Sequence, residues 1–286
     1  MNGILIVNKE AGYTSRDIVN LIGKKFNTRK VGHTGTLDPG ATGVLVICIG
    51  KALKVCELLT SNDKEYIAGI TLGIETDTLD MDGNIISTET VDIDEKKIKI
   101  AVDSFKGKYW QEVPKYSAVK VNGRKLYEYA RKGEVVELPK KEVNIKKIEM
   151  IDKVKYHDGK VYFKIKCTVS KGTYIRSLVR DIGNKLGVMA VMNSLERTRQ
   201  GKFNIDEAYT LEDIMNENYN IIRIEEALSE IPRIFVDDKE AFKIKNGVAI
   251  RKFDDTNQKF IFDKTGELLA LYKNDGQYAR VYKMFS

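Results

Sequence analysis

The segment from Gly32 to Gly43 constrains the fold of this chain more than any other, because it combines several glycines with a proline that restricts the backbone of the residue before it. It reads Gly-His-Thr-Gly-Thr-Leu-Asp-Pro-Gly-Ala-Thr-Gly and is followed by the apolar run 44–49. Pro39 disfavours helical backbone at Asp38 and holds that residue extended, while glycines on both sides allow another molecule to approach the backbone closely. The segment therefore predicts an ordered loop that presents Asp38 at the entrance to a buried strand.

Strand and helix patterns are mixed along the rest of the chain without a regular β-α-β alternation. Apolar residues recur at helical spacing after Thr14, which with Asp17 resembles a capping box. The pattern predicts strands at 3–8, 44–49, 64–72, 142–151 and 161–170, the last two forming a hairpin around 157–159. It predicts helices at 15–26, 52–59, 94–105, 125–131 and 173–186, a loop at 27–43 and an acidic turn at 77–84. This mixture predicts an α+β fold, with a large and mainly antiparallel sheet flanked by helices.

A domain boundary is predicted near Pro232. Beyond it come short alternating strands at 233–236, 260–262, 268–272 and 279–282, with turns at Asn246-Gly247, Thr265-Gly266 and Asp275-Gly276. We therefore expect a main domain over 1–231 and a small β-barrel over 232–286.

Composition excludes several classes of protein. The 286 residues contain three cysteines without C-x-x-C spacing and only two histidines, a set typical of neither a disulfide framework nor a metal site. No apolar run approaches the length of a membrane span, and the N-terminus lacks the features of a signal peptide. We therefore expect a cytoplasmic protein without a resident metal.

Positive charge is concentrated in one segment. The whole chain has 48 Lys and Arg against 41 Asp and Glu, and between Lys106 and Lys147 there are twelve against five. This basic segment, 106–147, thus accounts for the whole excess of the chain and predicts a polyanionic partner. A solvated lysine-rich surface is the alternative that composition leaves open.

Three interpretations of the segment 32–43 compete. A phosphate-binding loop fits the spacing from Gly35 to Gly40, but Ala41-Thr42 follows where Lys-Ser/Thr is required. A purely structural turn is the second. In the third, Asp38 is a catalytic carboxylate and therefore needs a cationic partner to stay ionised in a pocket that excludes water.

Arg176 is the cation that the sequence offers for this role. It follows Ser170-Lys-Gly-Thr-Tyr-Ile and lies in the first turn of a predicted helix, where the helix dipole favours acids rather than bases. Pairing with Asp38 would offset that cost and depress the pKa of the carboxyl. A surface arginine is the simpler alternative.

These segments together resemble the TruB family of pseudouridine synthases. The resemblance rests first on the Asp38 loop and on Ser170–Arg176. It extends, in order, to Lys64-Glu65-Tyr66 with 76–80, to 111–120 with 123–131, and to Leu195-Glu196-Arg197-Thr198. It spans roughly residues 3 to 200, and the tail after Pro232 resembles the family's small PUA-like domain.

The resemblance implies an isomerase that converts uridine 55 in the T loop of tRNA to pseudouridine without cofactor, metal or guide RNA, acting as a monomer. Asp38 is then the nucleophile, attacking either ribose C1′ or uracil C6. Tyr66 takes part in deprotonation at C5 and Arg176 pairs with Asp38. Tyr174 and Leu195 line the uracil pocket, His33 holds flipped-out loop nucleotides, and Lys9 supports the structure of the site, although Glu10 stands where the family usually has proline.

Other classes of function stay open at this stage. A non-catalytic RNA-binding or tRNA-folding module would keep the basic segment without needing Asp38, Tyr66 and Arg176. A guide-RNA-dependent pseudouridylase subunit would share the Asp38 motif but act with partner proteins. A single carboxylate without a second acid fits isomerisation better than hydrolysis of a glycosidic bond, which uses a pair.

Overall fold

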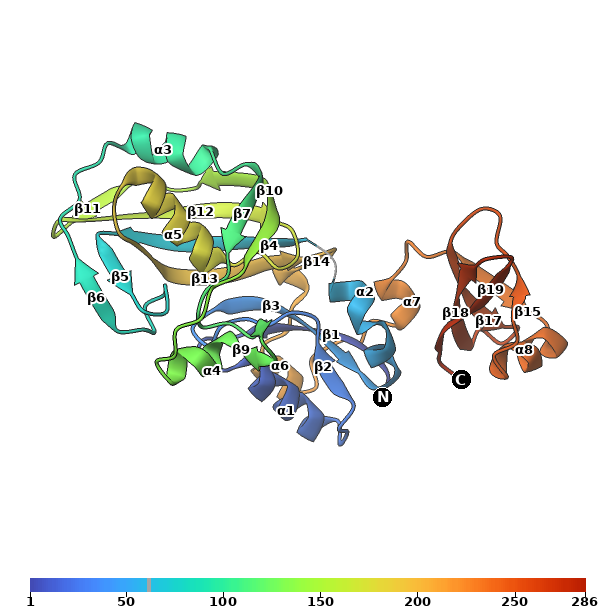
Figure 1. Ribbon diagram of the computed structural model, residues 1–286. Coiled ribbons are helices and arrows are strands. Elements are labelled where there is room, and N and C mark those ends of the chain that lie inside the picture. The colour runs from blue at the N-terminus through green and yellow to red at the C-terminus, as the bar shows by residue number, and fades with distance from the viewer. Residues whose placement is uncertain (61–62) are drawn as a thin grey trace.

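The computed structural model describes residues 1–60 and 63–286, and in this part of the chain its largest feature is a ten-stranded mixed sheet (Figure 1). The strands are β1 (Gly3–Lys9), β2 (Val31–His33), β3 (Thr42–Ile49), β4 (Lys64–Leu72), β7 (Gly107–Glu112), β10 (Lys140–Met150), β11 (Lys155–His157), β12 (Lys160–Val169), β13 (Ala190–Gln200) and β14 (Phe203–Asn204). The main order is β1-β3-β13-β4-β12-β10-β7, with β2, β11 and β14 attached at its sides. Every pairing is antiparallel except that of β3 with β13.

Two helices cover different parts of this sheet. Helix α5 (Ile175–Leu186) buries Leu178 and Ile182 against β4 and β12. Helix α1 (Ser15–Lys25) buries Ile18 and Ile22 against β1 and β3. The opposite face of β1 and β3 is also buried, in a second cluster, which is why the run 44–49 is apolar throughout instead of alternating.

Shorter elements complete this part of the chain. The helices are the 3₁₀ segment η1 (Gly50–Val55), α2 (Cys56–Thr60), α3 (Glu95–Asp103), α4 (Leu126–Arg131), η2 (Ile205–Glu207), α6 (Leu211–Met215) and α7 (Ile224–Ala227). Two small hairpins pair β5 (Ile74–Thr76) with β6 (Ile85–Thr88) and β8 (Lys120–Val121) with β9 (Arg124–Lys125).

The predicted α+β class is confirmed, and the strand at 64–72 has the predicted bounds. Three local predictions were wrong in detail. The helix predicted at 52–59 is split between η1 and α2, and the loop predicted at 27–43 contains β2. The tight hairpin at 157–159 joins β11 to β12, while β10 pairs further along β12, from Ile145 to Met150. These segments are short or paired over long range, so local periodicity did not resolve them.

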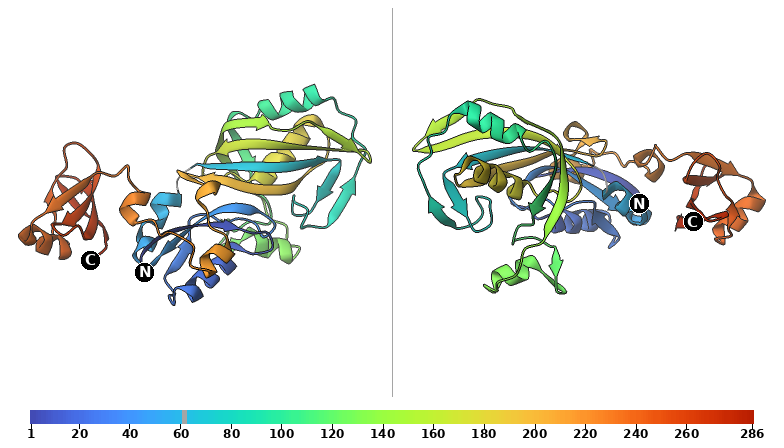
Figure 2. Two further views of the ribbon diagram at one scale, coloured as in Figure 1. Left: turned by 180° about the vertical axis from the view of Figure 1, so that it is seen from behind. Right: turned by 45° about the horizontal axis from the view of Figure 1, so that its top comes forward.

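The C-terminal residues form a second, five-stranded sheet that curls into a half-barrel (Figure 2). Its strands are β15 (Arg233–Val236), β16 (Ile250–Arg251), β17 (Gln258–Asp263), β18 (Leu268–Asp275) and β19 (Tyr278–Met284), in the order β15-β17-β18-β19-β16. The sequence did not predict α8 (Asp238–Lys245), a short helix capped by the Asp237 side chain. Asn246-Gly247 ends this helix instead of joining two strands.

The C-terminal sheet packs against the rest of the chain through apolar residues. Phe260, Leu271 and Phe285 share one buried cluster with Val55 and Leu228. At its edge the Tyr282 hydroxyl donates to Glu57 of α2 at 2.6 Å. Across residues 1–60 and 63–286, no helix combines the length and the hydropathy needed to cross a membrane.

Candidate active site

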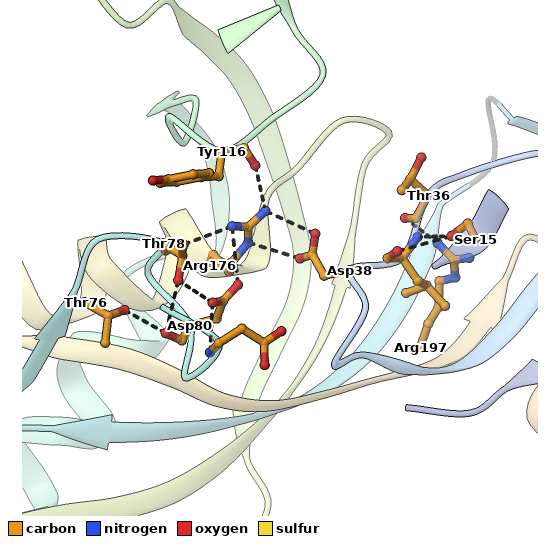
Figure 3. Close-up of polar contacts among 11 residues, drawn as sticks. Ser15, Thr36, Asp38, Thr76, Thr78, Asp80, Tyr116, Arg176 and Arg197 are labelled. Atoms are coloured by element: carbon orange, nitrogen blue, oxygen red, sulfur yellow. Dashed lines mark hydrogen bonds and ion pairs between the residues drawn. The ribbon is translucent and has the colours of Figure 1, made fainter. Parts of the chain in front are cut away.

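Asp38 lies on the loop between β2 and β3, and this loop is anchored to the scaffold at both ends (Figure 3). Ser15, the first residue of α1, accepts a hydrogen bond from the Leu37 N–H at 2.9 Å and donates to the Leu37 carbonyl at 3.2 Å. The buried guanidinium of Arg197, on β13, donates to the carbonyls of Gly35 and Val44. The backbone of the loop is therefore fixed by groups from α1 and β13 before any substrate binds.

Lys9 anchors the other end of the loop from within the core. Its side chain is fully buried, and its Nζ donates to the carbonyls of Glu10 at 2.9 Å, Tyr13 at 2.7 Å and Pro39 at 3.1 Å. An ammonium group has three donors, so every one of them is used. Lys9 thus lies behind the loop, and it does not line the pocket in front of it.

The glycines of the loop serve packing more than the approach of a substrate. Gly43 has a φ of +98°, and a Cβ there would lie 2.3 Å from the Arg197 carbonyl oxygen. A Cβ on Gly40 would lie 3.0 Å from the carboxylate of Asp82. Position 43 requires glycine because β3 and β13 lie too close together there for a side chain. At position 40 the missing side chain lets the carboxylate of Asp82 approach the loop.

Arg176 pairs with Asp38 as the sequence predicts. Its Nε and Nη2 lie 3.0 and 3.1 Å from the two carboxylate oxygens, a bidentate arrangement (Figure 3). The remaining donors reach the carbonyls of Thr78 and Tyr116 and, at 3.3 Å, the carboxylate of Asp80. All three nitrogens of the guanidinium therefore contact acceptor oxygens, which fixes its orientation.

The role of Asp80 was not predicted from the sequence. This residue was expected in an acidic turn, yet its carboxylate is buried and accepts from Thr78 Oγ1 and from the Asp82 N–H. It binds Arg176 from the side opposite to Asp38 (Figure 3). The spacing Thr78-x-Asp80-x-Asp82 indicated a local turn, but nothing in it indicated a partner almost a hundred residues away.

The pKa of Asp38 is shifted in the direction opposite to the predicted one. Burial raises the pKa of this carboxyl above its usual value. Arg176 acts against that effect, whereas the negative charges of Asp80 and Asp82 add to it. About 33% of the side chain is exposed, at the pocket. The ion pair therefore limits a rise in pKa and does not produce a net depression.

A pocket of about 640 Å³ opens in front of Asp38. Five of the seven predicted site residues line it: Asp38, Tyr66, Tyr174, Arg176 and Leu195. They come from the β2–β3 loop, β4, the start of α5 and β13, so adjacent strands β4 and β13 form one wall. Burial raises the pKa of Tyr174, whose phenol thus stays neutral near pH 7.

Three further cations line the same pocket and were not predicted as site residues: Lys64, Lys171 and Arg197. Burial lowers the pKa of Lys64 to about 8. Within residues 1–60 and 63–286, no three His, Cys, Asp or Glu side chains are grouped as a metal ion would require. The pocket is thus a cationic cavity with one accessible carboxylate, Asp38, at its wall.

His33 lies beside this pocket rather than in its lining. It is the last residue of β2, half-buried, and directly precedes Thr34, which does line the pocket. Burial lowers the pKa of His33, and the nearby cation Arg16 adds to the effect. The imidazole is therefore neutral at physiological pH.

The basic segment 106–147 forms β7, the β8–β9 hairpin, α4 and the start of β10. Of its aromatic residues, Tyr116 and Tyr127 line the Asp38 pocket, whereas Tyr129 is buried and Trp110 is 67% exposed on β7. The segment thus reaches the pocket with two tyrosines.

Family models match most of the chain. The model for the N-terminal domain of TruB family pseudouridylate synthases matches residues 23–175. The model for the C-terminal domain of tRNA pseudouridylate synthase B matches residues 176–231. The two matches meet at the start of α5, between Ile175 and Arg176.

Relatives of similar length also match. A protein of Bacillus subtilis (strain 168) named tRNA pseudouridine synthase B is 41% identical, over 99% of this chain and 93% of its own length. A protein of the same name from Bacillus anthracis is 40% identical over 99% of this chain and 96% of its own length.

Solved structures with a similar fold come from multi-component complexes. One is described as an H/ACA RNP bound to a substrate RNA containing 2′-deoxyuridine, with a TM-score of 0.69 and 25% identity over 99% of this chain and 85% of that one. A second, described as a Cbf5-Nop10-Gar1 complex, has a TM-score of 0.69 and 27% identity over 99% of this chain and 85% of that one.

Proposed function

The chain belongs to the TruB family of pseudouridylate synthases, and on that premise we propose that it isomerises uridine 55 in the T loop of tRNA. The names of the Bacillus relatives support tRNA as the substrate. The observation that carries the proposal is the bidentate ion pair between Asp38 and Arg176 at the wall of a cationic pocket.

Asp38 is the nucleophile in this proposal. It attacks the ribose C1′ or the uracil C6, the bond from N1 to C1′ breaks, and the base turns so that C5 bonds to the sugar. The bond to Asp38 then breaks, C5 loses its proton and N1 takes one up, so that the carboxylate is regenerated. Arg176 keeps the carboxylate ionised against the effect of burial, and its other contacts hold the carboxylate in one orientation. Because the loop backbone is fixed before the RNA binds, Asp38 is already in position, and no conformational entropy is lost in ordering it during the reaction.

Tyr66, Tyr174 and Leu195 form the uracil site. A base inside a folded RNA loop cannot react in place, so it is flipped into the pocket at a cost of a few kcal/mol of unstacking. Stacking on an aromatic ring returns about 1–3 kcal/mol per base. Tyr66 lies on the same strand as Lys64 and takes part in removing the proton from C5. His33, neutral and next to the pocket, contacts the neighbouring nucleotides.

The rest of the chain binds the RNA outside the pocket. The basic segment 106–147 contributes positive charge and two pocket tyrosines. We propose that 1–231 form the catalytic domain and 232–286 a small PUA-like RNA-binding domain, since the second sheet begins directly after Pro232. A monomeric state and a cytoplasmic location stay predictions.

The test is release of tritium from a T-arm stem-loop RNA labelled at uracil C5. Pseudouridine formation replaces the C5–H bond by a bond from C5 to the sugar, so one equivalent of tritium enters water per RNA. The purified chain is added alone, without metal, nucleotide or guide RNA, and mass spectrometry locates the modified position. We expect one equivalent of release from a single uridine.

Asp38→Asn is the matched control. It should abolish turnover while leaving RNA affinity within about tenfold, since the lost group acts in chemistry rather than in docking. Residual activity above a few per cent would contradict the role of Asp38. Tight RNA binding without release by the wild type would favour a non-catalytic module. Release only with a guide RNA and partner proteins would favour a subunit like those of the H/ACA complexes.

A further inference from the structure

A groove of about 530 Å³ runs along the exposed side of α1, outside the Asp38 pocket. Its charged lining residues are Arg16, Lys24 and Arg29, and Asn20 and Asn27 add side-chain amides. Among residues 1–60 and 63–286, no Asp or Glu lines it. The groove lies outside the basic segment 106–147, so the count of charges along the chain did not indicate it.

The spacing of these residues produces one straight stripe. Arg16, Asn20 and Lys24 stand at i, i+4 and i+8, which places them on one face of a helix. The buried residues Ile18 and Ile22 fix the opposite side against the sheet. At 1.5 Å per residue, Arg16 and Lys24 are separated by about 12 Å along the axis, a span long enough for more than one phosphate of a nucleic-acid strand.

The positive charge of the groove is not neutralised by the protein. Within the described part of the chain, Arg16, Lys24 and Arg29 take part in no ion pair or side-chain hydrogen bond, and all three are exposed. Lys25, next to the stripe, instead pairs with Glu217 at 3.3 Å. The acid on α1, Asp17, is bound to Thr14 in the helix cap. Three cations thus converge on one groove without a counter-charge.

The groove begins next to the catalytic loop. Ser15, the residue before Arg16, holds Leu37 through two hydrogen bonds. Arg16 is also close enough to His33 to contribute to lowering its pKa. In Figure 1, α1 lies below β1 and β3, on the side of the molecule where α4 also lies. A strand that leaves the Asp38 pocket past His33 therefore passes close to Arg16, at the start of the groove.

We propose that this α1 groove binds backbone phosphates of the substrate RNA, on the strand that continues from the flipped nucleotide past His33. The inference rests on the proposed function in requiring an RNA substrate. Its chemistry is that of guanidinium and ammonium groups binding phosphate oxygens, with the two asparagine amides as additional donors. Such contacts position the RNA without reading its sequence.

The experiment compares two triple variants in full-length protein. The test variant is Arg16→Gln/Lys24→Gln/Arg29→Gln. The control is Lys96→Gln/Lys97→Gln/Lys99→Gln on α3, which removes the same charge from three exposed lysines that have no ion pair in the described chain. Affinity for the T-arm stem-loop is measured by fluorescence anisotropy across a salt series, and tritium release gives kcat and KM.

Neutralising three phosphate contacts should reduce the slope of log K against log salt by roughly 2–3, at about 0.7–0.9 per contact. We expect the affinity of the test variant to fall at least tenfold at low salt. Its kcat at saturating RNA should stay within about twofold of wild type, because no groove residue contacts the reacting base. The control should keep the wild-type slope.

Two results would overturn the inference. One is a test variant with wild-type affinity and slope. The other is an equal loss in both triple variants, which would show a general effect of net charge. The wild-type reaction is measured alongside, and absence of tritium release from wild type would contradict the proposed function itself. Tritium release by wild type, together with unchanged RNA affinity and salt slope in the test variant, would contradict only this inference. Thermal unfolding of each variant confirms that it is folded.

Discussion

Replacing Lys9 by methionine tests whether the catalytic loop depends on an anchor that never touches substrate. Methionine keeps most of the volume and removes three charge-assisted hydrogen bonds to carbonyls. Bonds to charged groups are worth about 1.5–3 kcal/mol each. Burial lowers the pKa of Lys9 from 10.5 to about 8, so keeping it charged at neutral pH costs about 3 kcal/mol. The free energy of unfolding should therefore fall by roughly 1.5–6 kcal/mol in Lys9→Met, the difference between the three bonds lost and the cost of burying the charge.

Activity should fall as well, because the Pro39 carbonyl follows directly after Asp38, the proposed nucleophile, in the chain. A misplacement of the order of 1 Å costs about 100-fold in rate. We therefore expect kcat to drop roughly 10–100-fold at 25 °C, where the variant is still folded, with little change in KM for the RNA.

The assay combines urea unfolding at pH 7 with tritium-release kinetics. Lys25→Met is the control, because Lys25 also donates to a carbonyl and pairs with a carboxylate, but with the highly exposed Glu217. It should change the free energy of unfolding by less than about 1 kcal/mol. Wild-type stability together with wild-type kcat in Lys9→Met would refute the reasoning.

The other predictions concern the ion pair, a thiol and a glycine. In Arg176→Gln, loss of the guanidinium removes the main effect that opposes the raised pKa of Asp38, so the acidic limb of the kcat/KM profile should move to higher pH. Adding Asp80→Asn to this variant should move the acidic limb part of the way back to lower pH. An acidic limb at the wild-type pH in Arg176→Gln would contradict the role of Arg176. The hydrogen bond from Cys48 lowers the pKa of Cys56 to about 7, while burial raises that of Cys167 to about 12. Iodoacetamide should therefore label Cys56 first, with a rate that rises through about pH 7, and peptide mapping that finds equal labelling would disprove it. Gly43→Ala should lower Tm by several degrees in calorimetry, since φ is +98° and the added Cβ meets Arg197 at 2.3 Å, whereas Gly12→Ala, with open space around it, should lower it less.

Elements with local signals were predictable from the sequence. The capping box at Thr14 and Asp17 forms as expected, and Gly187 ends α5 in the left-handed conformation. The apolar residues that alternate along β12 all lie in the core: Val161, Phe163, Ile165, Cys167 and Val169. Each of these features depends on neighbours within a few residues, so the chain itself contains the information.

The composition of the candidate site was predictable in part. The Asp38 loop and the Arg176 segment are distinctive as motifs, and the structure brings their side chains into contact. The sequence did not indicate that Asp80 shares the same guanidinium, or that Arg197 and Lys9 anchor the loop. These partners come from strands and loops far apart along the chain, and no periodic pattern links them.

By itself, then, the sequence determined the fold class and the family and indicated Asp38 as the candidate nucleophile, because these follow from local patterns and an unusual motif. Tertiary structure decided the electrostatics. Insertion of β13 between β3 and β4 brings Arg197 under the catalytic loop. Burial among Asp80 and Asp82 turns the expected fall in the pKa of Asp38 into a rise. Packing of α1 on β1 and β3 leaves its Arg16 and Lys24, together with Arg29 of the following loop, on one open groove. Charge interactions depend on distance and solvent exposure, and both are set only when the strands take their places in the sheet.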